Sequence, residues 1–131
     1  MAFDRLQKYS PYFLALLRIV TALLFIEHGT AKLMGFPSMG GGGSPPLLSL
    51  FGVAGLIEII GGILVLLGLF TRPAAFIMAG EMAVAYWMMH APNSPFPLLN
   101  QGEAAILFCF VFLYLVAAGP GAWSVDGNRG R

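Results

Sequence analysis

The sequence predicts an all-α membrane protein, a bundle of four transmembrane helices with both termini on the cytoplasmic side. Two observations carry this prediction: 58% of the 131 residues are hydrophobic while 10% are charged, and the apolar residues fall into four long runs. A soluble domain carries about 25% charged residues, so this chain is too apolar to cover itself with a water-facing surface. Because one crossing takes roughly 20 residues, four crossings nearly fill residues 1–131, and we expect a single transmembrane domain.

The first apolar run extends from about residue 11 to 34, and the second from 47 to 70. The segment Gly40–Pro46, with the sequence GGGGSPP, separates them. Such a segment cannot continue a helix and predicts a flexible loop. Glycines on both sides of Glu58 indicate that the second helix approaches a neighbour closely.

The third run covers about residues 74–90, and the fourth about 100–118. Thr71–Pro73 predicts a tight turn before the third run, since proline favours a first helical position and disfavours helix in the preceding residue. Three prolines within residues 91–97 exclude regular structure there. The fourth helix is expected to stop at the GPG sequence that follows it.

Basic residues outside the runs predict the orientation. If both ends and the turn near residue 72 share one side, that side carries all the basic loop residues: Arg5, Lys8, Arg72, Arg129 and Arg131. The other two loops contain no Lys or Arg. The positive-inside rule then places both termini in the cytoplasm.

Charge and cysteine content exclude several classes of function. The net charge is +1 and Lys and Arg do not cluster, which argues against a nucleic-acid partner, since phosphate binding needs concentrated positive charge. The single cysteine, Cys109, excludes an intrachain disulfide and dithiol chemistry. We interpret it as a small buried hydrophobic residue.

Each predicted helix carries one glutamate: Glu27, Glu58, Glu81 and Glu103. Ionisable groups inside a span are costly unless they are paired, hydrated or neutralised, so they normally face the interior of a bundle. The helical rise of 1.5 Å per residue puts Glu58 and Glu81 near the midplane, with Glu27 and Glu103 roughly 5 to 10 Å toward the outer side. The four carboxyl groups can therefore surround one cavity that is biased toward the outer face.

The first helix adds basic groups to this set. His28 and Lys32 share one stripe, Arg18 lies about 60° to its side, and Glu27 points away from it. Four glutamates against Arg18 and Lys32 leave two excess negative charges, which is unfavourable in low dielectric, so the site must take up protons, a cation, or both. We predict proton transfer by Glu58, Glu81, Glu103 and His28, and substrate binding by Lys32, Arg18 and Glu27.

Simpler interpretations stay open beside this one. The buried charges can form interhelical ion pairs that only fix the packing. A metal site is not expected, because no Glu-x-x-His pair occurs. The methionines before His90 are interpreted as packing residues rather than copper ligands, and His90 itself is placed at the outer interface, with a role in proton transfer left open.

Five segments, taken in order and spacing, resemble the DoxX family of small bacterial membrane proteins over almost the whole chain. They are HGTAK at 28–32, GLIEIIGG at 55–62, GLFTRPAA at 68–75, QGE at 101–103 and GPGAWSVD at 119–126. The resemblance implies a multi-pass protein of the bacterial inner (plasma) membrane that is linked to redox work. Some relatives are associated with quinone-coupled oxidation of thiosulfate, and others with membrane complexes that handle thiol or oxidative stress. The family pattern falls on His28, Lys32, Glu58, Arg72, Glu103 and Asp126, with Arg18 and Glu27 close to it.

The leading hypothesis is therefore a quinone-linked or thiol/sulfur-linked oxidoreductase component with a buried carboxylate, His and Lys site. A redox cofactor has to be quinone itself or reside in a partner, since the sequence contains no visible haem or iron–sulfur ligand set. Two alternatives stay open: a small transporter or channel for protons or a small solute, and a non-catalytic scaffold. The expected partners are the lipid bilayer and a redox protein, and self-association into a homo-oligomer is left open.

Overall fold

The structure is a computed structural model that describes residues 2–37 and 47–128. Within these ranges every regular element is a helix, which confirms the all-α class. The long helices are α1 (Ser10–Met34), α2 (Leu50–Leu67), α3 (Thr71–Ala85) and α5 (Glu103–Ala118). The short elements are η1 (Ala2–Tyr9), η2 (Tyr86–His90), η3 (Ala91–Asn93), α4 (Pro97–Asn100) and α6 (Val125–Asn128).

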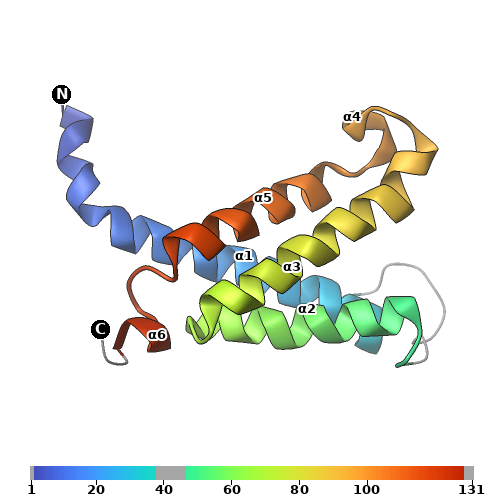
Figure 1. Ribbon diagram of the computed structural model, residues 1–131, viewed down its shortest axis with the longest axis horizontal. Coiled ribbons are helices and arrows are strands. Elements are labelled where there is room, and N and C mark those ends of the chain that lie inside the picture. Colours follow the sequence, from blue (N-terminus) through green and yellow to red (C-terminus); the bar gives the residue numbers. More distant parts are fainter. Residues whose placement is uncertain (1, 38–46, 129–131) are drawn as a thin grey trace.

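The described helices include two that are long and apolar enough to cross a membrane. One is the continuous helical segment Ala2–Met34 and the other is α2, while α5 is apolar but has only 16 residues. Both chain ends lie at the end of the molecule that also carries the α2–α3 turn (Figure 1). An even number of crossings is consistent with this arrangement, and the bundle of four crossings with both termini inside stays a prediction.

The long helices form two antiparallel hairpins. One hairpin is α1 packed on α2, the other is α3 packed on α5, and α2 contacts α3 where the hairpins meet. Figure 1 shows the hairpins close together near the chain termini and diverging toward the end that carries α4. The shared core consists of fully buried side chains, among them Phe25, Met78, Phe112 and Leu115. On the side where the hairpins diverge, residues of all four long helices line a cavity.

Glycines set the end of α2 and the distance between α1 and α2. The second helix begins after Ser49, whose Oγ accepts a hydrogen bond from the amide of Gly52 at 3.1 Å. It ends at Gly68, whose φ of 69° suits glycine. A Cβ added at Gly29 of α1 would lie 3.0 Å from the carbonyl oxygen of Gly55. The two backbones are therefore in near contact, as the glycines beside Glu58 predicted.

The turn between α2 and α3 differs from the prediction. Thr71–Pro73 was expected to form it, but these residues are the first turn of α3, and the chain turns at residues 68–70 instead. Pro73 is tolerated there because the first amides of a helix have no intrahelical acceptor. The amides of Phe70 and Thr71 instead donate to the Asp126 carboxylate, at 3.0 Å each. A distant residue thus caps α3.

The segment 91–97 also differs from the prediction, since its prolines do not exclude regular structure. The third helix continues into the π-helical turn η2, which is followed by the single 3-10 turn η3 and then by α4. Pro92 and Pro97 stand in the first turns of η3 and α4, where a missing amide proton costs nothing. The predicted glycine-rich loop Gly40–Pro46 lies outside the described residues, as do Arg129 and Arg131 of the orientation argument.

Candidate functional site

A cavity of about 530 Å³ lies between the two hairpins, on the side where they diverge. Its volume is within the range of sites that hold small organic ligands, roughly 300 to 1,000 Å³. Its polar groups include Lys32, Glu58 and Glu81, together with His28 and His90. The remaining lining is mainly apolar, with aromatic, aliphatic and methionine side chains from all four long helices and from η2. The cavity therefore suits a ligand with an apolar body and a small polar part.

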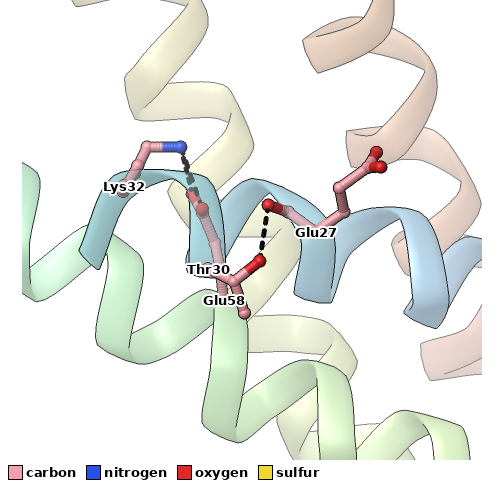
Figure 2. A network of polar contacts seen from close by, with 4 residues as sticks. All are labelled: Glu27, Thr30, Lys32 and Glu58. Atoms are coloured by element: carbon pink, nitrogen blue, oxygen red, sulfur yellow. Dashed lines mark hydrogen bonds and ion pairs between the residues drawn. The ribbon is translucent and has the colours of Figure 1, made fainter. Parts of the chain in front are cut away.

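Two of the polar side chains that line the cavity form an ion pair between α1 and α2. Lys32 Nζ donates to Glu58 Oε1 at 2.9 Å and to Oε2 at 3.2 Å (Figure 2). The Glu58 side chain is 1% exposed and that of Lys32 is 16% exposed. Lys32 Nζ also lies 5.3 Å from the centre of the Phe51 ring, a cation–π distance. Lys32 is thus held at the cavity wall by both contacts.

Glu81 brings a second carboxyl group to the same place from the other hairpin. Its side chain lies beside that of Glu58 in the cavity lining. The Oε1 atom of Glu81 is buried and has no hydrogen-bond partner among the described residues. The site therefore places one basic and two acidic side chains together in a mainly apolar lining, where a net charge is unfavourable.

Two histidines lie farther along the cavity. His28 is exposed and packs edge-to-face on Phe108, with ring centres 5.7 Å apart. His90 Nδ1 lies 3.0 Å from the carbonyl oxygen of Asn100. A carbonyl oxygen can only accept, so Nδ1 carries the proton and Nε2 of a neutral His90 is left as an acceptor. The sequence left the use of His90 open, and its position beside the proline-rich segment was the signal that pointed to it.

The predicted set of four carboxyl groups does not surround one cavity, because Glu27 and Glu103 are absent from its lining. Both are exposed. The Glu27 side chain points away from the Lys32–Glu58 pair, and its backbone carbonyl accepts from Thr30 Oγ1 at 3.1 Å (Figure 2). Glu103 is the first residue of α5, where a carboxylate interacts favourably with the positive end of the helix dipole. Their predicted roles in substrate binding and proton transfer stay predictions.

Arg18 lies away from this cavity, toward the end that carries the termini. It is fully buried, and its guanidinium donates to the backbone carbonyls of Pro120, Ala122 and Trp123. The Arg18 side chain thereby fixes the segment that follows α5 against α1. Its predicted contact with substrate stays a prediction, and this geometry supports a structural role instead.

Phe25 and Phe108 of the cavity lining belong to an aromatic cluster that also contains Phe112. The Phe25 ring packs on Phe108 with centres 5.4 Å apart and on Phe112 with centres 4.9 Å apart, both edge-to-face. Phe25 and Phe112 are fully buried.

Comparison with known proteins gives consistent matches. The DoxX family model matches residues 13–91. A protein of Haemophilus influenzae described as uncharacterized is 54% identical over 95% of this chain and 96% of its own length. Two Escherichia coli K12 proteins named inner membrane protein YphA and inner membrane protein YqjF are 34% and 29% identical, over 88% and 83% of this chain and 89% and 85% of their own lengths. No solved structure matches.

Proposed function

This chain belongs to the DoxX family, and on that premise we propose that it is an inner-membrane oxidoreductase component that binds a quinone-like molecule between its two hairpins. In this proposal α1, α2, α3 and α5 all cross the membrane and both termini are cytoplasmic, as the distribution of basic loop residues favours. Relatives whose names describe them as inner membrane proteins support the location. The cavity then opens toward the outer half of the bilayer.

The single observation that carries the proposal is the buried, unpartnered Oε1 of Glu81 beside the Lys32–Glu58 ion pair. An orphaned buried oxygen is unfavourable, and a ligand that hydrogen bonds to it removes that cost. The surrounding wall is mainly apolar. A quinol matches both features, because its hydroxyl groups can donate to that oxygen while its ring and tail are apolar. The carbonyl oxygens of the oxidised quinone can instead accept from a protonated carboxyl group.

The residues of the site can supply what quinone chemistry needs from the protein. Reduction of a quinone to a quinol takes up two electrons and two protons, and in this proposal a redox partner protein supplies both electrons. One proton comes from the pair of carboxyl groups of Glu58 and Glu81. The second reaches the other oxygen through His28 or His90, which line the same cavity. The Lys32 ammonium group stabilises the negative charge that develops on the nearer oxygen. Oxidation of a quinol runs through the same groups in reverse.

Two features favour this chemistry over the alternatives. Cys109 packs against the core, which disfavours thiol chemistry by this chain. Fully buried Phe25 and Phe112 pack with Phe108 beside the cavity, and such an apolar cluster favours a binding site over a continuous path for protons or solutes.

Native mass spectrometry and quinone titration of the full chain in lipid nanodiscs test the proposal. We expect saturable binding of a short-tailed quinol, whose hydroxyl group can donate to Glu81, and Glu81→Gln should weaken it about tenfold or more, the usual worth of a hydrogen bond to a charged group. Glu103→Gln is the matched control, since Glu103 is exposed and outside the cavity, and we expect unchanged affinity.

An activity measurement completes this test. Membranes that contain the native partner should show quinone-dependent electron transfer that requires this chain and falls in the Glu81→Gln variant. Absence of both quinone binding and quinone-dependent activity would overturn the proposal. Proton flux into proteoliposomes that Glu58→Gln abolishes would replace it with the transporter alternative.

A further inference from the structure

The N-terminal element η1 is a fully unburied helix with three distinct edges. Side chains three residues apart eclipse one another in a 3-10 helix. Phe3, Leu6 and Tyr9 therefore form one apolar edge, and they are 78%, 45% and 45% exposed. Arg5 and Lys8 form a second, basic edge, and none of the residues of η1 is buried. An exposed apolar edge next to a basic edge indicates a surface that binds a partner with both apolar and anionic parts.

The length of α1 places η1 outside the hydrocarbon core. The 25 residues of α1 extend about 37 Å at 1.5 Å per residue, which is already more than the roughly 30 Å of bilayer hydrocarbon. The eight residues of η1 add about 16 Å at 2.0 Å per residue. Figure 1 shows that η1 turns away from the axis of α1. The element therefore has the length and the direction to lie along the membrane surface.

Aromatic side chains beside η1 mark the level of the lipid headgroups. Tyr12 packs on Trp123 with ring centres 5.3 Å apart, and the two are 46% and 61% exposed. Tyrosine and tryptophan gather at membrane–water interfaces. Lys8 Nζ lies 5.2 Å from the centre of the Tyr9 ring, so this ammonium group also lies next to an aromatic side chain. These contacts place the junction of η1 and α1 at the headgroup level.

We propose that η1 is an interfacial anchor that binds anionic phospholipid headgroups. Its apolar edge enters the boundary between headgroups and acyl chains, and Arg5 and Lys8 pair with lipid phosphates. Charge complementarity selects anionic lipid as the occupant, because the two basic side chains lie on one edge and a zwitterionic surface carries no net charge to attract them. This proposal is independent of the quinone site.

Fluorescence quenching of the full chain in nanodiscs tests the anchor. In a Cys109→Ala background, an environment-sensitive label is attached at Leu6→Cys on the apolar edge or at Gln7→Cys on the third edge, which carries Asp4 and Gln7. We expect a quencher on the lipid chain near the headgroup to reach the label at position 6, and aqueous iodide to reach the label at position 7. Phosphatidylglycerol in the nanodisc should strengthen the lipid quenching at position 6 relative to phosphatidylcholine alone.

Substituting the two basic residues of η1 separates the electrostatic contribution to membrane attachment from the apolar contribution. Each basic residue near an anionic surface strengthens attachment about fivefold, so Arg5→Gln with Lys8→Gln should remove most of the effect of phosphatidylglycerol. Amide hydrogen exchange of residues 2–9 in the unlabelled chain gives a second readout, and we expect slower exchange with the anionic lipid. Equal iodide access at positions 6 and 7, indifference to lipid charge, or protection of position 6 from both quenchers, as in a protein–protein contact, would each overturn the proposal.

Discussion

Lys32 of α1 and Glu58 of α2 form a two-pronged ion pair, with Nζ 2.9 Å from Oε1 and 3.2 Å from Oε2. The pair exists because the two helices approach closely at Gly29 and Gly55. Glu58 is 1% exposed, so water cannot replace its partner. The ion pair therefore links the packing of the first hairpin to the chemistry of the cavity.

Substituting one partner of this ion pair should destabilise the folded protein more than expected from substituting both partners together. We expect Lys32→Met alone to lower the free energy of unfolding by roughly 3 to 5 kcal/mol, because it leaves the buried Glu58 carboxyl group without its partner. Glu58→Gln alone should cost less, because Glu81 remains beside Lys32. The double variant should lose less than the sum of the two. Denaturant unfolding in detergent micelles measures this cycle, and additive losses would show that the two side chains do not interact in the folded protein.

Glu81 should matter for ligand binding and not for the empty fold. Glu81→Gln replaces a group that needs a shared proton with a neutral amide of the same size, so we expect the thermal unfolding temperature without ligand to stay equal or to rise. The same variant should lose the stabilisation that an added quinone gives to the wild-type chain. A large loss of stability without ligand would instead assign Glu81 to the packing of the two hairpins.

Substitution of Arg18 should change the stability of the folded protein and not its affinity for quinone. Arg18→Met leaves the three carbonyl groups of residues 120, 122 and 123 without their donor. We expect a loss of about 3 kcal/mol or more and faster proteolysis of the segment after α5. Arg18→Lys keeps the charge but not the forked geometry, so its loss should be intermediate. Quinone affinity should be unchanged in folded Arg18→Lys, and a tenfold drop would restore the predicted substrate contact of Arg18.

Gly29 and Gly80 offer a matched pair of glycine substitutions in two helices. A Cβ at Gly29 would lie 2.6 Å from Ile59 Cγ1 and 3.0 Å from the Gly55 carbonyl oxygen, whereas a Cβ at Gly80 has nothing within 4 Å. We expect Gly29→Ala to lower stability by about 1 to 3 kcal/mol through overpacking, and Gly80→Ala to raise it by up to about 1 kcal/mol through helix propensity. Thermal unfolding in detergent compares the two, and equal effects would contradict the close approach of α1 and α2.

Local sequence signals predicted the helices well, and the connections less well. The first helix, for example, was expected at residues 11–34 and is observed at Ser10–Met34, because an apolar run bounded by proline and glycine is a local property. The turn before α3 was misplaced, because the capping group for its first amides is the carboxylate of Asp126. No local pattern around Thr71 reveals an acceptor that lies more than fifty residues away in the chain.

The sequence by itself determined that this protein is helical and apolar, and it predicted an interior that contains Arg18, Lys32 and four glutamates as groups of opposite charge. Only the tertiary structure decided that Glu58 and Glu81 meet beside Lys32, that Glu27 and Glu103 are exposed, and that Arg18 binds backbone carbonyls. Helical periodicity gives the height of a side chain and its angle on its own helix. The rotation of one helix against another depends on contacts such as that between Gly29 and Gly55, and these form only when the hairpins pack.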